Sequence, residues 1–236
     1  MIKIGLVMPT FIYNEERYRW CERSLTSLVR TEYPGYRPHL VMVIKGGIQH
    51  PPQFSTVQAF GIFDPSVLVQ PEDARNGCGA LIYGFDWLFQ NDLEITHALF
   101  VGDDFVYHPS WLKQQEYLIA RHPEAASTYV YRSNNTRHHR TIREEAGDCL
   151  VTNISGPGCF SREEWKAFGM TYRDFPRPDG CTLDILHARM RPGERWVTKS
   201  SYIQQIGVRG MHNNSGECDE ALDFVGEGAT LHLEDI

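Results

Sequence analysis

Short apolar runs alternate with amphipathic segments through the first half of this sequence, and this alternation is the feature that most constrains the fold. Ile4–Met8, Leu40–Ile44, Val67–Val69 and Ala98–Val101 have the length and composition of buried strands. Helical spacing of apolar residues follows the first of these strands and recurs in Gly79–Phe89. Because strands that alternate with helices need crossover connections, the sequence predicts an α/β fold with a mostly parallel sheet flanked by helices.

Capping residues mark where several of these helices begin and end. Asn14 and Ser110 each precede a helical pattern and are expected to be N-caps. Ser161, with Glu164 three residues later, is typical of a capping box, and Gly169 is expected to end that helix.

The second half of the sequence is less regular. Ser127–Tyr131 and Cys149–Ile154 are predicted strands, and Thr182–Met190 is a predicted helix. The polar, basic stretch Arg132–Asp148 between the two strands is interpreted as a loop. No linker or repeat divides the chain, so a single domain over residues 1–236 is expected.

The composition limits the class of protein. With 236 residues, of which 42% are hydrophobic, the chain can bury a core, and its formal net charge of −7 argues against a general nucleic-acid binder. No apolar run is long enough to cross a bilayer and no signal peptide begins the sequence, so a soluble, cytoplasmic protein is expected. The six cysteines include no C-x-x-C pair, which favours buried free thiols.

Two adjacent carboxylates, Asp103 and Asp104, follow the strand Ala98–Val101 and form the most informative motif. Such a pair is costly at the end of a buried strand unless a cation neutralises it. Mg²⁺ or Mn²⁺ prefers oxygen ligands and can bridge to a diphosphate, whereas the alternative interpretation is a simple Gly-Asp-Asp turn. Ligands of parallel sheets bind beyond the carboxyl ends of the strands, where Pro9–Thr10 and Lys45–Gly47 also fall.

The residues around the acidic pair resemble the DXD region of GT-A-fold glycosyltransferases, especially the family-2-like, inverting group. Leu99–Phe105 followed by Pro109–Leu112 matches that group's strand, acidic residues and Pro-x-Trp-Leu. The opening strand and turn, Ile4–Phe11, resembles the same group. Further matches occur in the same order along the chain, at Arg75–Ala80, Ser155–Arg162 and Ser201–Gly207. The resemblance therefore covers about residues 1–212.

The resemblance implies a metal-dependent glycosyltransferase that moves a sugar from a nucleotide-sugar donor to an acceptor hydroxyl, with inversion and with Mn²⁺ or Mg²⁺. It implies a nucleotide-sugar-binding half (about 1–110), an acceptor half (about 111–212) and a C-terminal tail (213–236). By position, Asp104 matches the metal ligand, Asp103 the residue that meets the donor ribose or sugar, and Arg75 a basic residue near the diphosphate. The turn that would hold the nucleobase is formed by Pro9, Thr10 and Phe11.

Two positions depart from the pattern of the resembled group. Lys45 stands where an acidic residue usually pairs with the base, and lysine cannot accept a hydrogen bond from a uracil N–H. A UDP-sugar is the first candidate donor, but Lys45 leaves open another base, another way of reading the base, or a phosphate contact. Gln205 stands where the group often has a histidine, and His212 is a candidate metal ligand in its place, with a surface or capping role as the alternative.

The general base of an inverting transfer is expected to be a carboxylate near the acceptor. Asp179 precedes the predicted helix Thr182–Met190 and is the first candidate, and Asp184 inside that helix is the second.

The acceptor is not specified by the sequence. The basic segment Arg132–Arg143 is interpreted either as a solvated loop or as a contact for an anionic acceptor, such as a glycan or a modified DNA base. A protein that binds nucleotide-sugars, or a nucleotidyltransferase-like protein without glycosyl transfer, is the alternative function.

Overall fold

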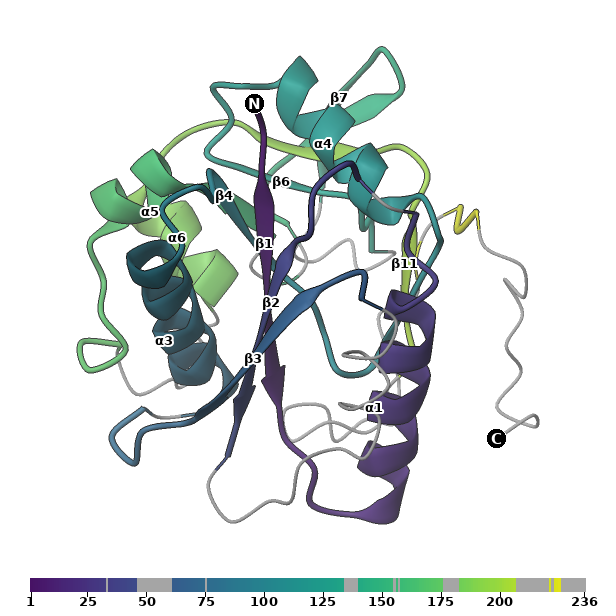
Figure 1. Ribbon diagram of the computed structural model, residues 1–236. Helices are drawn as coiled ribbons and strands as arrows, with labels where there is room; N and C mark the ends of the chain where they lie inside the picture. Colours follow the sequence, from purple (N-terminus) through teal and green to yellow (C-terminus); the bar gives the residue numbers. More distant parts are fainter. Residues whose placement is uncertain are drawn as a thin grey trace.

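The computed structural model describes residues 1–32, 34–45, 61–74, 76–133, 140–154, 156, 158–175, 183–206, 221 and 223–225. Within these residues a nine-stranded sheet has the order β3-β2-β1-β4-β9-β6-β10-β8-β7 (Figure 1). Its strands are β1 (Ile4–Thr10), β2 (His39–Ile44), β3 (Asp64–Val69), β4 (His97–Phe100), β6 (Ser127–Tyr129), β7 (Thr141–Glu145), β8 (Asp148–Val151), β9 (Cys159–Ser161) and β10 (Arg195–Thr198). A separate two-stranded sheet pairs β5 (Phe105–Tyr107) with β11 (Ile203–Gln205).

The first half of the sheet is parallel, as the alternation of strands and helices predicts. β1 pairs in parallel with both β2 and β4, and β2 pairs in parallel with β3. The second half is mixed: β6 and β10 are parallel, whereas β9 is antiparallel to β4 and β6, and β8 is antiparallel to β10 and β7. The predicted α/β fold is confirmed, with its parallel character concentrated in β3-β2-β1-β4.

Helices cover both faces of the sheet (Figure 1). One face packs against α1 (Glu15–Leu28) and α4 (Trp111–Arg121), and the other against α3 (Asn76–Asn91), α5 (Arg162–Phe168) and α6 (Leu183–Met190). The side chains of β1 alternate accordingly, since Leu6 and Met8 belong to the first core and Val7 to the second. Both faces of β1 are therefore covered by apolar side chains.

Two of the three predicted N-caps are confirmed. Asn14 accepts a hydrogen bond from the backbone N–H of Arg17 (2.8 Å), and Ser161 accepts one from Glu164 (3.0 Å). Gly169 ends α5 with a φ of 65°. Ser110 precedes α4 but its side chain does not cap the helix, because its hydroxyl lies 2.8 Å from His108 Nδ1 and is engaged there.

The prediction of a loop over Arg132–Asp148 is wrong for part of that stretch. Thr141–Glu145 forms β7, which pairs with β8 across a turn in which Ala146 and Gly147 have φ values of 50° and 87°. β7 is an edge strand with mostly exposed side chains, so it has no alternating apolar face by which a sequence pattern could identify it.

The composition predicts buried free cysteines and no segment that crosses a membrane. Cys21, Cys78, Cys149 and Cys159 are free, and all but Cys78 are buried, as predicted. Cys181 and Cys218 lie outside the described residues. In the part of the chain that the structure describes, no helix combines the length and the apolar character needed to cross a bilayer.

Close packing of α3 on the sheet depends on a glycine. A Cβ at Gly84 would lie 2.3 Å from Val7 Cγ1 and 2.9 Å from Val43 Cγ2. We expect Gly84→Ala to lower the free energy of unfolding by about 1–3 kcal/mol, because the helix must move off the strands. The matched control is Gly77→Ala in the same helix, where a Cβ meets nothing within 4 Å. Urea unfolding should show the control unchanged or stabilised by about 0.5–1 kcal/mol, and equal destabilisation by both changes would contradict this packing argument.

Candidate functional site

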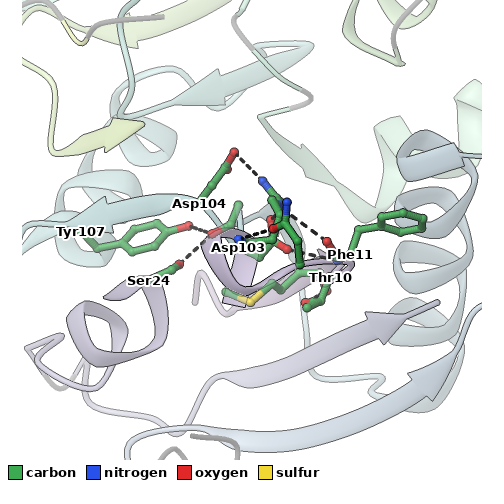
Figure 2. A network of polar contacts seen from close by, with 10 residues as sticks. Thr10, Phe11, Ser24, Asp103, Asp104 and Tyr107 are labelled. Carbon is green, nitrogen blue, oxygen red and sulfur yellow. Dashed lines mark hydrogen bonds and ion pairs between the residues drawn. The ribbon is translucent and has the colours of Figure 1, made fainter. Parts of the chain in front are cut away.

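The ends of three neighbouring strands meet at one edge of the sheet, as the sequence predicts. Asp103 and Asp104 follow β4, Phe11 follows β1, and Lys45 follows β2. Asp103 is only 5% exposed, and its Oδ2 accepts a hydrogen bond from the backbone N–H of Phe11 (3.1 Å) (Figure 2). Asp103 is therefore tied directly to the turn after β1.

Arg17, in the first turns of α1, bridges the two carboxylates. Its Nη2 lies 2.5 Å from Asp103 Oδ1 and its Nη1 lies 3.2 Å from Asp104 Oδ2. Its Nε donates to the carbonyl oxygen of Phe11 (3.4 Å), and the whole residue is 8% exposed. The guanidinium thus occupies the space between the acidic pair and the turn after β1.

The electrostatics of this cluster differ between its members. Burial alone would lower the pKa of Arg17, but the charges of Asp103 and Asp104 outweigh it and raise that pKa. Burial, followed by the charge of Asp103, raises the pKa of Asp104 to about 6, although Arg17 acts in the opposite direction. Two carboxylates therefore share one internal cation. Burial and the charge of Asp103 disfavour the ionised form of Asp104.

Two hydroxyl groups hold the backbone of the turn that carries the acidic pair. The carbonyl oxygen of Gly102 accepts hydrogen bonds from the hydroxyls of Ser24 and Tyr107, each at 2.9 Å (Figure 2). Ser24 comes from α1 and Tyr107 from β5, so two elements fix the position of Gly102. These contacts limit how far the two carboxylates can move.

The closing segment of the described chain also reaches the acidic pair. β11 pairs with β5, and the backbone N–H of Ile206 donates to the carbonyl oxygen of Asp104 (2.8 Å). The side chain of Gln205 lies near enough to the Asp104 carboxylate to lower its pKa, against the larger effect of burial. Gln205, the position at which the resembled group often has histidine, therefore does lie at the site.

The residues expected to hold a nucleobase have different surroundings. The Lys45 ammonium lies 4.3 Å from the centre of the Phe11 ring in a cation–π contact, and Lys45 is exposed. Pro9 lies opposite Val43 in the sheet register. Thr10 is 2% exposed and its hydroxyl lies 3.4 Å from the Met8 carbonyl oxygen, so it is turned inward.

The predicted catalytic and metal-binding residues are described only in part. Asp184 lies in the first turn of α6 and accepts a hydrogen bond from the side-chain amide of Asn153 (3.1 Å). Arg75, Asp179 and His212 lie outside the described residues, so their predicted roles stay predictions.

Only the ends of the predicted basic segment are described. Arg132 lies 3.8 Å from Glu144, whereas Arg143 lies 3.3 Å from Glu145 and over the ring of Trp196. These arginines are therefore part of the sheet edge around β7, and residues 134–139 lie outside the described residues.

Arg17 is the site residue that motif matching missed. The sequence nevertheless contains a signal, because Arg17 falls on the buried face of α1, at helical spacing from Cys21, Ser24 and Leu28. A charged residue on the core face of a helix needs an opposite charge nearby, and the acidic pair supplies it.

The expected divalent cation can be compared with the donor atoms at the site. Carboxylate oxygens are suitable ligands for Mg²⁺ or Mn²⁺. However, both oxygens of Asp103 and one oxygen of Asp104 already accept hydrogen bonds from Arg17 or Phe11. Among the described residues, no three His, Cys, Asp or Glu side chains gather to hold a metal ion. This arrangement of the acidic pair does not fit a divalent cation, and the metal stays a prediction.

The fold and the position of the site define a GT-A-type α/β fold, and comparison with solved structures agrees. The chain is similar to S. aureus TarS, with a TM-score of 0.60 and 13% identity over 88% of this chain and 37% of TarS. It is also similar to TarS 1–349 in complex with UDP-GlcNAc, with a TM-score of 0.59 and 15% identity over 89% of this chain and 60% of the other. These similarities confirm the predicted fold.

A third similarity is to a nucleoside-diphosphate-sugar pyrophosphorylase from Vibrio cholerae RC9, with a TM-score of 0.52 and 8% identity over 85% of this chain and 95% of the other. No protein-family model matches the chain, and no curated protein matches its sequence. Identities this low show the fold alone, so membership of the family-2-like group stays a prediction. The chain spans 37% of TarS and 60% of the shorter TarS structure.

Proposed function

We propose that this protein is a glycosyltransferase that moves a sugar from a nucleotide-sugar donor to an acceptor hydroxyl with inversion. One observation carries the proposal: Asp103 and Asp104 lie beyond the carboxyl end of β4, with Asp103 hydrogen-bonded to the turn after β1, in a fold shared with TarS. TarS structures contain UDP and UDP-GlcNAc. The strand ends of an open α/β sheet are where such ligands bind.

The residues at this edge have the chemistry that a nucleotide-sugar requires. The leaving diphosphate needs positive charge, and Arg17 and Lys45 are two cations that contact residues just beyond the strand ends, Asp103 and Phe11. The Phe11 ring offers an aromatic surface to a nucleobase. Asp103, held by Phe11 and Arg17, is a fixed acceptor for donor hydroxyl groups.

Lys45 affects which nucleobase the protein would prefer. Its ammonium is a donor only, so it cannot pair with an imide N–H of uracil. Its place over the Phe11 ring instead suits a phosphate contact or a base with acceptor atoms at its edge. We therefore propose that discrimination between uridine and other nucleosides is weak at this position.

The acceptor would bind to the second half of the chain, about residues 111–212. A glycan or another hydroxyl compound, such as a modified DNA base, is proposed, with the basic segment Arg132–Arg143 as its contact. Arg140 and Arg143 are exposed at the sheet edge, which suits an anionic partner.

A second candidate function is nucleotidyl transfer without glycosyl transfer. The observation that favours it is the similarity to the V. cholerae pyrophosphorylase, which extends over 95% of that chain. The products separate the two candidates, because glycosyl transfer releases a nucleoside diphosphate, whereas nucleotidyl transfer from a nucleoside triphosphate and a sugar phosphate releases pyrophosphate.

Binding of nucleoside diphosphates tests the proposal. We expect UDP, GDP or ADP to raise the melting temperature, since a ligand present at 100 times its Kd adds about 2.7 kcal/mol to folding. Phe11→Ala should lose most of this shift, while Tyr117→Ala, which changes an exposed aromatic residue of α4, should keep it. Thermal melts with each nucleotide, with Mn²⁺ and with EDTA, check this. The absence of any shift in every condition would contradict the proposed donor site.

A further inference from the structure

Arg17 occupies the position at the acidic pair that a bound cation would take. Its two terminal nitrogens contact Asp103 Oδ1 (2.5 Å) and Asp104 Oδ2 (3.2 Å), and its Nε contacts the Phe11 carbonyl oxygen (3.4 Å). The side chains of all three charged residues are at most 15% exposed. Charge-assisted hydrogen bonds in so little water are strong ones.

Arg17 is also held in this position by the helix that carries it. Asn14 caps α1 by accepting from the backbone N–H of Arg17 (2.8 Å). The guanidinium carbon lies 5.4 Å from the centre of the Trp20 ring, a cation–π contact on the same helix. The arginine is therefore preorganised for the acidic pair, and does not reach it by a chance side-chain orientation.

An external cation must compete with this internal one. A divalent ion that approaches Asp104 loses the oxygen already bonded to Arg17, and it also meets the repulsion of the guanidinium charge. Moving Arg17 away without another partner would leave a buried cation unpaired, which is costly. Both effects lower the affinity of the nucleotide-free protein for a metal.

We propose that Arg17 is an internal counter-ion that competes with divalent cations for Asp103 and Asp104, so that the protein binds Mg²⁺ or Mn²⁺ weakly at this pair while the guanidinium stays in place. Replacing Arg17 frees the carboxylate oxygens that it occupies and removes its repulsion, so the affinity for the metal should rise.

Arg17 is a positioning residue in this proposal, and its test uses metal binding without nucleotide or activity. Free Mn²⁺ is titrated by electron paramagnetic resonance against the parent protein and Arg17→Gln. We expect Arg17→Gln to bind Mn²⁺ about tenfold more tightly or better. The matched control is Arg19→Gln on the same helix, whose arginine pairs only with Glu15 at the surface among the contacts described, and it should behave as the parent.

Two further variants keep the test decisive. Arg17→Gln combined with Asp104→Asn should lose the gained affinity, because the released carboxylate is gone. If Arg17→Gln does not fold, Arg17→Lys replaces it. A single ammonium cannot contact both carboxylates in the way that the guanidinium does, so Arg17→Lys should also raise Mn²⁺ affinity, by a smaller factor. Equal Mn²⁺ affinity of the parent and the folded Arg17 variant would overturn the proposal.

Discussion

Replacing Asp104 with asparagine is expected to stabilise the protein at pH 7.5 and, in the same variant, to lower sugar transfer by orders of magnitude. Burial and the neighbouring charge of Asp103 raise the pKa of Asp104 to about 6, so its ionised form is disfavoured in the folded protein. Asparagine keeps the shape and an acceptor oxygen for Arg17 but has no charge to bury. The variant should transfer sugar more slowly, because the acidic pair has lost one of its two charges.

The pH dependence follows from the direction of the pKa shift. The protonated form of Asp104 is favoured by folding, so its contribution to stability is full below the unfolded pKa of about 3.9 and is lost as the pH rises through about 6. At pH 7.5 the lost contribution is on the order of 3 kcal/mol, as an upper bound. Thermal melts should therefore show a clear gain for Asp104→Asn at pH 7.5 and little at pH 4.

A matched control is Asp184→Asn, which removes one carboxylate from the partly exposed start of α6. It should give no comparable gain in melting temperature at pH 7.5, because this carboxylate is not buried against a second one. If Asp104→Asn gives the same gain at pH 4 as at pH 7.5, the acidic pair does not carry the buried repulsion described here.

Replacing Asp179 with asparagine is expected to lower the rate of transfer by about 10²–10⁴-fold, with little change in donor affinity. The acceptor hydroxyl must lose a proton as the diphosphate leaves, and a carboxylate beside the acceptor is a suitable base. Asp179 shortly precedes α6 in the sequence. Transfer rates and nucleotide affinity of Asp179→Asn and Asp184→Asn, measured side by side, check the assignment.

Each outcome of that comparison has a defined meaning. Near-normal transfer by Asp179→Asn with a large loss in Asp184→Asn would move the base to Asp184. The anomeric configuration of the product is the second measurement, and inversion is expected. Retention of configuration would reject the single-displacement mechanism whichever aspartate acts as base.

The parallel half of the fold could be predicted because its strands are buried on both faces. Ile4–Met8 and Leu40–Ile44 are continuous apolar runs, and the helical spacing of apolar residues between them predicts α1. The mixed half could not be predicted as well, since Thr141–Glu145 has a single aliphatic residue and four mostly polar neighbours. Its strand pairing is decided by contacts with β8, which a local pattern does not contain.

The candidate site shows the same contrast. Motif order predicts Asp103, Asp104, Phe11 and Lys45 at one end of the sheet, and Asp103 and Lys45 both contact Phe11. Gln205 is predicted only as a departure from the group's histidine, with His212 as the candidate in its place, yet Gln205 lies near Asp104. Motif order does not identify Arg17, because the resemblance implies an external ion as the cation at the acidic pair. The burial of a charged residue on one helix face is visible in the sequence, but its partner is fixed only by how α1 packs beside the turn after β4.

The hydrogen bond between Ile206 and the carbonyl oxygen of Asp104 has a consequence for synthesis of the chain. β5 follows the acidic pair immediately, whereas its partner β11 is made only after most of the remaining sequence. The surroundings of Asp104 are therefore incomplete until Ile206 has left the ribosome. A product that ends before β11 lacks both this hydrogen bond and the partner strand of β5.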